Sequence, residues 1–368
     1  MIISLIACLV ILTGAILLFL RQAQFGALPK GERLKRIKSS PHYRDGQFHN
    51  QSPTVLMAKK SRLAVLLDFL FVKVNDLRPK HDLPVVKTDL KGISLQEEVL
   101  IWFGHSSLYI QLQGQRILVD PVLISASPVS FLNKAFKGTN RYHPDDFPEI
   151  DILLLTHDHW DHLDYGTLIS LRERIKSVVC PLGLGAHLER WGFLPQQITE
   201  LDWNQGLQTA GNIRITALPA RHFSGRSFRS NKSLWAGYML QSLWGNIYLS
   251  GDTGYDTHFE AVKKRFGTID LAIMENGQYN ENWPYIHMLP ANLVKAVKDL
   301  QPRHLLTVHH SKYALARHPW FEPLAKIAAT AHRDGLPLHT PRIGEILPLS
   351  SEKLSNSTIH LPDTTWWE

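Results

Sequence analysis

The sequence predicts an α/β fold in which two strand-rich halves pack face to face beneath covering helices. The first half combines β-rich segments with a helical pattern, at 99–103, 107–112, 116–119, 151–155 and 165–175. The second half repeats this order, with strands near 213–218, 235–241 and 247–250 and a helix near 257–266. Two sets of strands, each followed by helices, favour two packed sheets with helices on the outside.

Single segments carry their own signals. In residues 151–155, Asp151 is followed by an apolar run that is typical of a strand buried on both faces. Gly114-Gln115 marks a tight turn between two β-rich segments. The rest of the chain predicts two more strands and two more helices, at 271–274 and 305–308 and at 291–300 and 320–333.

The composition is that of a folded globular protein, with 368 residues, 44% hydrophobic and 20% charged. The net charge of +7 is concentrated in one stretch, where seven basic residues stand close together: Arg21, Lys30, Arg33, Lys35, Arg36, Lys38 and Arg44. The remainder is close to neutral, so nucleic acid is not an expected partner. Cys8 and Cys180 are the two cysteines and do not suggest a disulfide framework.

The first twenty residues predict a membrane-spanning helix. Residues 1–20 contain no charged side chain, and about 20 apolar residues cross a bilayer core of roughly 30 Å. A cleaved signal peptide is the alternative, but no basic residue precedes the apolar run and no small-residue cleavage site follows it. Because the basic residues all follow the span, we expect a single-pass protein of the inner (cytoplasmic) membrane with its catalytic domain in the cytoplasm.

The rest of the chain divides into three parts. Residues 21–54 are basic and polar and predict an extended connector. Residues 55–350 form the predicted catalytic domain, and residues 351–368 form a tail. Near the start of the domain, the apolar segment 63–74 predicts a helix that is too short to span a membrane. It either packs on the core or dips into the membrane interface.

The segment directly after the apolar run predicts a metal centre. It reads Thr156-His157-Asp158-His159-Trp160-Asp161-His162, with three imidazoles and two carboxylates within six residues. Neutral imidazole and carboxylate are ligands that zinc prefers. His157 and His159 can face one ion, while Asp161 and His162 face a second. A surface cluster of histidines is the alternative, and the specific His-x-His-x-Asp-His order argues against it.

This segment resembles the signature of the metallo-β-lactamase superfamily, and the resemblance extends from about Val99 to the last predicted helix. It implies the αββα sandwich of that family and two Zn²⁺ ions per chain. It also implies that the remaining ligands are His222, Asp252 as the bridging carboxylate, and His309. Asp120, in Ile-Leu-Val-Asp-Pro, matches a structural aspartate that supports the ligands from behind.

Within the superfamily, the chain is most similar to N-acyl-phosphatidylethanolamine-hydrolysing phospholipase D and its bacterial relatives. The similarity includes the stretches 102–106, 251–255 and 308–316, although His310-Ser311-Lys312 departs from the family's usual His-Trp-Gly. It implies a membrane-associated phosphodiesterase with a phospholipid substrate, and it allows a homodimer. His287 matches a family histidine near the active site, so we expect His287 and Asp161 to act in catalysis.

Two other functions stay open. Fold does not fix substrate, so the chain could be a hydrolase of another class, such as a lactonase or a soluble phosphodiesterase. A non-catalytic membrane scaffold with a relict metal site is the third hypothesis. The seven retained ligands argue against it: His157, His159, Asp161, His162, His222, Asp252 and His309.

Overall fold

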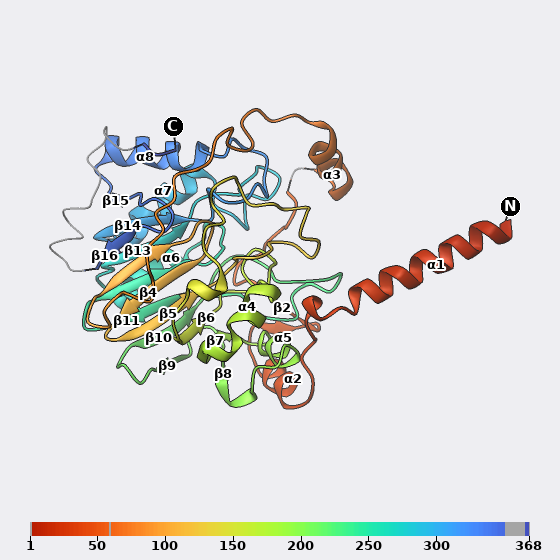
Figure 1. Cartoon of the computed structure of the whole chain (residues 1–368), viewed down its shortest axis with the longest axis horizontal. Coiled ribbons are helices and arrows are strands. Elements are labelled where there is room, and N and C mark those ends of the chain that lie inside the picture. The colour runs from red at the N-terminus through yellow and green to blue at the C-terminus, as the bar shows by residue number, and fades with distance from the viewer. Residues whose placement is uncertain (1, 59, 350–364, 368) are drawn as a thin grey trace.

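The computed structural model describes residues 2–58, 60–349 and 365–367. Within these residues, two mixed sheets of seven strands each form the centre of the molecule (Figure 1). The first sheet has the order β16 (Ile346–Pro348), β3 (Val99–Trp102), β4 (Leu108–Leu112), β5 (Gln115–Val119), β6 (Ile150–Leu154), β7 (Ile175–Pro181) and β8 (Ile198–Leu201). The second has the order β15 (Leu338–His339), β14 (His304–Val308), β13 (Leu271–Glu275), β12 (Asn246–Leu249), β11 (Gly237–Gln241), β10 (Arg214–Leu218) and β9 (Gly206–Gln208).

The two sheets pack face to face, and strand periodicity explains how. In β4, Leu108, Ile110 and Leu112 enter the cluster between the sheets, whereas Tyr109 points into the outer cluster. The inner cluster joins residues of both sheets, including Ile117 and Ile247. The central strands are therefore buried on both faces.

Helices cover the outer face of each sheet. The outer cluster of the first sheet includes residues of α4 (Tyr165–Leu171) and α5 (Gly185–Arg190). The outer cluster of the second sheet includes residues of α6 (His258–Phe266), α7 (Pro290–Leu300) and α8 (Glu322–Asp334). The predicted αββα architecture is confirmed.

The segment predictions are confirmed to within a few residues, with one shift at a turn. The turn between β4 and β5 is Gln113-Gly114 and not Gly114-Gln115, because both of its residues adopt positive φ, 49° and 71°. Two successive positive φ values define the hairpin turn whose twist matches the flanking strands. The short strands β8, β9, β15 and β16 were not predicted.

The N-terminal segment forms helix α1 (Ile2–Leu20), which projects from the body in Figure 1. We predicted a membrane span here. No helix in the described part of the chain combines the length and the apolar character needed to cross a membrane, so this prediction is not supported. The inner-membrane location that depended on it stays a prediction.

Residues 21–54 are not the extended connector that we predicted. They contain the one-turn helix η1 (Ala23–Phe25), α2 (Gly31–Lys38) and a hairpin of β1 (Tyr43–Arg44) and β2 (Gln47–Phe48). Helix α2 has Glu32 in its first turn and basic residues in its last, which suits the helix dipole. Arg33 forms ion pairs with Glu189 and Glu200, so part of the basic stretch binds the domain itself.

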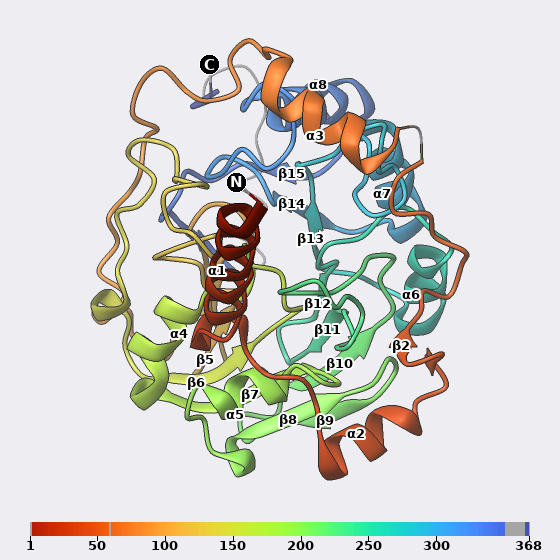
Figure 2. The same ribbon diagram turned by 90° about the vertical axis from the view of Figure 1, so that its right-hand side faces the viewer.

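Two further segments complete the chain. Helix α3 (Arg62–Phe71) lies on the same side of the body as α1, as Figures 1 and 2 show. Leu63, Leu67 and Phe71 of α3 are exposed, so this helix does not bury its whole apolar face. Most of the predicted tail, 351–368, lies outside the described residues, but Trp367 packs among the residues under α8.

Candidate metal centre

The predicted ligands gather where strands of both sheets end. The loop 157–162 follows β6, which is parallel to β5, the strand that leads to Asp120. His222 follows β10, Asp252 follows β12 and His309 follows β14. Since β12, β13 and β14 are parallel, their carboxyl ends meet at one edge. A rigid edge of this kind can aim loop side chains at a common point.

The first ligand group contains His157, His159, His222 and Asp252. One nitrogen or oxygen from each lies within 4.8 Å of all the others. The ring nitrogens converge, with His157 Nε2 2.9 Å and His222 Nε2 3.1 Å from His159 Nδ1. The structure therefore brings together the three histidines that we predicted for one ion.

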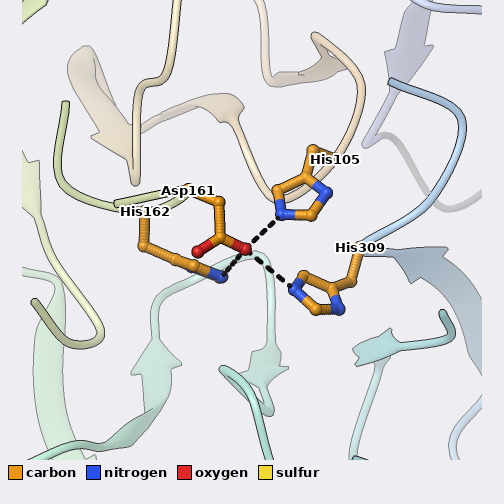
Figure 3. Close-up of side chains that lie close together, drawn as sticks. All are labelled: His105, Asp161, His162 and His309. Atoms are coloured by element: carbon orange, nitrogen blue, oxygen red, sulfur yellow. Dashed lines mark hydrogen bonds and ion pairs between the residues drawn. The ribbon is translucent and has the colours of Figure 1, made fainter. Parts of the chain in front are cut away.

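The second ligand group contains Asp161, His162, His309 and a residue that we did not predict, His105. Figure 3 shows the three rings directed at one oxygen of Asp161. Asp161 Oδ2 lies 2.8 Å from His105 Nε2, 3.4 Å from His309 Nε2 and 3.6 Å from His162 Nε2. The group joins three distant parts of the chain: the β3–β4 turn, the loop after β6 and the end of β14.

Asp252 lies between the two groups. Its Oδ2 atom is 3.2 Å from His162 Nε2 and 3.1 Å from His309 Nε2. The same oxygen is 3.8 Å from His157 Nε2 and 3.7 Å from His222 Nε2. A carboxylate within reach of histidines of both groups has the position that a bridging ligand requires.

The other nitrogen of several rings is held by a fixed partner. His162 Nδ1 lies 2.8 Å from Asp120 Oδ2, and His222 Nδ1 lies 2.8 Å from the carbonyl oxygen of Ile286. Both oxygens accept, so each Nδ1 donates a proton and Nε2 is the nitrogen that faces the other ligands. This is the supporting arrangement found behind metal-binding histidines.

The backbone at the site is also unusual. Asp120, His105 and His309 have φ values of 40°, 53° and 70°, in the left-handed region that non-glycine residues rarely adopt. Such conformations cost on the order of 1–3 kcal/mol each and cluster at functional sites. An antiparallel bridge between His105 and His310 fixes two of these segments against each other.

The buried carboxylates of the centre favour positive charge beside them. Burial raises the pKa of the Asp252 carboxyl, but His162 and His309 more than offset it and hold that pKa well below its usual range. Conversely, burial lowers the pKa of His309, while Asp252 and Asp161 raise it to about 10. Burial holds the pKa values of His157 and His222 well below normal, so these rings are neutral, the form that binds a metal.

Several buried polar atoms at the centre lack hydrogen-bond partners. Among the described residues, these include Nε2 of His162, Nε2 of His309 and Oδ1 of Asp252. Buried unpaired polar atoms are costly, so their presence together calls for a ligand. A metal ion accepts electron pairs from imidazole nitrogen and carboxylate oxygen alike, and the residues fit such a group.

Comparisons with known proteins agree with this geometry. Residues 115–310 match the family model described as beta-lactamase superfamily domain. The chain belongs to the metallo-β-lactamase superfamily. An uncharacterized protein of Mycobacterium tuberculosis is 34% identical over 320 residues, which cover 84% of each chain. N-acyl-phosphatidylethanolamine-hydrolyzing phospholipase D 1 of Caenorhabditis elegans is 31% identical over 61% of this chain and 67% of its own length.

Solved structures show the same fold. A novel metallo hydrolase from Ignicoccus hospitalis superposes with a TM-score of 0.52, at 19% identity, over 68% of this chain and 97% of its own. With the family match and the clustered ligands, the protein is a metal-dependent hydrolase of the metallo-β-lactamase superfamily.

The predicted catalytic residue His287 lies beside the ligands of this metallo-β-lactamase-fold hydrolase. Its ring stacks on His309 with centroids 5.1 Å apart, and its centroid is 5.0 Å from that of His222. The fully buried carboxylate of Glu275 lies 2.8 Å from His287 Nδ1 and also accepts from the backbone N–H of Met288. Glu275 therefore fixes the ring through Nδ1, and Nε2 is the ring nitrogen that Glu275 does not hold.

The segment that departs from the family pattern has a structural role in this superfamily member. Lys312 is buried, and its Nζ donates to the carbonyl oxygens of Phe103, at 3.1 Å, and Val122, at 2.9 Å. His310 bonds to Thr307 and Ser311 and belongs to none of the ligand groups formed by described residues. Lys312 thus holds the loops around His105.

Sequence reasoning missed two residues of the metallo-β-lactamase centre, His105 and Glu275. A signal existed for His105, because the stretch 102–106 resembles the family and Gly104, a typical turn residue, follows the predicted strand 99–103. Glu275 ends β13 in a run that reads as an ordinary buried strand. The only signal for Glu275 was a charged residue at the end of an otherwise apolar strand.

Proposed function

We propose that this hydrolase is a zinc phosphodiesterase of the phospholipase D type, acting on glycerophospholipids that resemble N-acylphosphatidylethanolamine. In this reaction water adds to phosphorus, the bond from phosphorus to the ethanolamine oxygen breaks, and the amide-bearing alcohol leaves with a proton. The products are a phosphatidate and an N-acylethanolamine. The identity of 31% to the C. elegans phospholipase D supports this substrate class.

The observation that carries the proposal is a chain of contacts from an apolar helix to the ligand loop. Phe19 in α1 packs edge-on against Phe25, with ring centroids 5.1 Å apart. Phe25 packs in turn against Trp160, with centroids 5.2 Å apart. Trp160 stands between the ligands His159 and Asp161. An apolar helix with exposed side chains is therefore joined, through these aromatic contacts, to the loop that carries the predicted metal ligands.

Zinc is the metal that we propose, with two ions per chain. The first ion would be held by His157, His159 and His222, the second by Asp161, His162 and His309, and Asp252 would bind both. This donor set of imidazoles and carboxylates suits zinc, although other first-row metals accept the same ligands. When bound, two such ions activate water and stabilise charge on phosphoryl oxygens.

His287 and Asp161 are the catalytic residues in this proposal. His287, oriented by Glu275, would donate a proton to the leaving alcohol oxygen through Nε2. Asp161 would contribute from its place among the ligands, held by His105. Both side chains come from loops on the same edge of the sandwich, so they face one substrate.

Association with a membrane is part of the proposal. Many large apolar side chains of α1 are exposed, such as Leu5, Leu9 and Ile11 at 72%, 64% and 71%. Helix α3, on the same side of the body, exposes Leu63 and Phe71. Apolar helices beside a basic stretch favour binding to anionic lipid surfaces. We propose the cytoplasmic face of the inner membrane as the location.

A product assay tests the reaction. The full chain, purified in detergent and loaded with zinc, would be incubated with N-acylphosphatidylethanolamine and, separately, with an acyl lactone. We expect phosphatidate and N-acylethanolamine from the lipid and no ring opening of the lactone. The variant His309→Ala controls for contaminating enzymes. Lactone opening without release of phosphatidate would replace the proposal with the lactonase alternative.

A further inference from the structure

A cavity of about 420 Å³ lies at the foot of α1, and its lining includes neither His287 nor any of the predicted metal ligands. One wall is the segment from Leu20 to Lys30, and the other is the loop 226–233. Asp158 and His187 form part of its base. We call this cavity the foot pocket.

The segment from α1 to α2 is fastened to the body, so the foot pocket is built from fixed walls. Arg190 donates to the carbonyl oxygens of Gly26 and Arg21, and Trp191 Nε1 donates to that of Ala23 at 2.7 Å. The backbone N–H of Ala27 donates to His187 Nδ1 at 3.0 Å. A Cβ on Gly26 would collide with the His187 ring, so this approach requires glycine.

The foot pocket is strongly cationic. Five basic residues line it: Lys30, Arg190, Arg226, Arg229 and Lys232. Of the described residues in its lining, Asp158 alone is acidic. Its carboxylate already accepts from Ser233 Oγ at 2.8 Å and from the backbone N–H of Gly225 at 2.6 Å. Asp158 offsets one of these five positive charges, so the pocket keeps a surplus of positive charge for a ligand.

The hydrogen bonds that the basic side chains make within the protein do not neutralise their positive charge. The buried Arg226 guanidinium donates to the carbonyl oxygens of Asp158, Leu163 and Gln24 and stacks 3.8 Å from the centroid of the Trp160 ring. Lys232 Nζ donates to the carbonyl oxygen of Gly46. Carbonyl oxygens are neutral, so these contacts orient the cations without cancelling them.

Part of the remaining lining is apolar and includes Leu20, the last residue of α1. Phe25, Leu28 and Pro29 line the pocket together with Leu20 and the cationic side chains. Beside it, Phe228 is 86% exposed, between Ser227 and Arg229 of the lining. An exposed aromatic ring next to a cationic pocket suits the boundary between lipid tails and headgroups.

We infer that the foot pocket is a second binding site, which holds the phosphate of an anionic phospholipid. Arginine and lysine match the negative oxygens of a phosphate, and the apolar wall matches the start of the acyl chains. Free phosphate shares the anionic chemistry but would leave the apolar wall unused. The site does not depend on the reaction at the metal centre.

The test compares vesicles of two compositions. The full chain would be bound to phosphatidylcholine vesicles and to vesicles with one fifth phosphatidylglycerol, and the ratio of the two affinities measured. The double variant Lys30→Gln/Arg229→Gln removes two exposed cations of the pocket. The control Arg214→Gln/Lys264→Gln removes two exposed cations from β10 and α6.

We expect the pocket variant to lower the preference for anionic vesicles about tenfold and the control to change it by less than twofold. An equal loss in both would show diffuse attraction and overturn the inference. In a second arm, inorganic phosphate is added during thermal unfolding. Stabilisation of the native protein that the pocket variant lacks, with vesicle binding unchanged, would also overturn it, because free phosphate would then be the ligand.

Discussion

Asp161 Oδ2 and His105 Nε2 lie 2.8 Å apart, although the two residues are 56 positions apart in the sequence. His105 is fully buried, and burial together with the neighbouring His309 lowers its pKa to about 3, so the ring is neutral. A neutral ring whose Nε2 faces a carboxylate donates through that nitrogen. His105 thus fixes the Asp161 oxygen that the second ion would need.

We expect His105→Ala to lower both affinity for the second metal ion and kcat by about 10–100-fold, as removal of such supporting residues does elsewhere. His105→Gln should recover much of the loss, because its amide nitrogen reaches about as far as Nε2. Metal titration and turnover of a phosphodiester would be measured for both. Equal losses in the two variants would contradict a role through the hydrogen bond to Asp161.

The neighbouring residues His309 and His310 have different roles, the first as a predicted metal ligand and the second in local hydrogen bonds. His309 belongs to the ligand group of Asp161, whereas His310 bonds to Thr307 and Ser311. We expect His309→Ala to lose at least about 1,000-fold in kcat, equal to about 4 kcal/mol of transition-state stabilisation. His310→Ala should lose far less turnover at a temperature where both variants are folded. A larger loss in turnover for His310→Ala would reject this assignment of the pair.

The sequence could predict the sandwich because its signals are local. Strands such as 271–275 are apolar up to their last residue, and amphipathic helices such as 290–300 follow them. The short edge strand β16 could not be predicted, since its three residues pair with β3 from the far end of the chain. Its pairing depends on a contact that no local pattern encodes.

The candidate site was predictable to the extent that its motif is contiguous. The loop 157–162 contains four of the expected ligands in six residues, whereas Glu275 reaches His287 only through the folded arrangement of β13 and the loop before α7. Residues 21–54 were misjudged for a related reason. Their basic residues suggested a solvated segment, yet Arg33 finds two carboxylates on the body.

Removal of metal should destabilise the protein. Bound ions would give partners to His162 Nε2, His309 Nε2 and Asp252 Oδ1, the buried atoms that now lack them in the described structure. A ligand that binds only the folded state stabilises it, by about 2.7 kcal/mol at a hundredfold excess over Kd. We therefore expect chelation to lower Tm by about 5 °C or more, and two equivalents of zinc to restore it. Restoration by one equivalent would contradict a two-metal centre.

Asp252 should matter for both ions. Its Oδ2 atom lies within 3.8 Å of four histidine nitrogens, two from each ligand group. Asp252→Asn keeps the shape but removes the negative charge that offsets two dications. We expect at least about 1,000-fold lower kcat, about 4 kcal/mol, and weaker binding of both ions. His222→Ala, by contrast, should weaken the binding of only one ion. Elemental analysis of the metal content of both variants would distinguish them.

Lys312 makes a pH-dependent contribution to stability. Burial lowers the pKa of its ammonium group to about 8, against 10.5 for the unfolded chain. Between these values the unfolded chain binds more protons than the folded one, so the free energy of unfolding rises as pH increases from 8 to 10.5. Below pH 8 the buried charge opposes folding in full.

Comparison with Lys312→Met isolates this contribution, because tyrosines and other groups that titrate in alkali are shared by both proteins. From pH 7 to pH 10, we expect the native chain to gain about 2–3 kcal/mol in free energy of unfolding relative to Lys312→Met. Denaturant unfolding at several pH values measures the difference. If the difference is constant across that range, then Lys312 is not the buried cation that holds Phe103 and Val122, and another group must support the loop around His105.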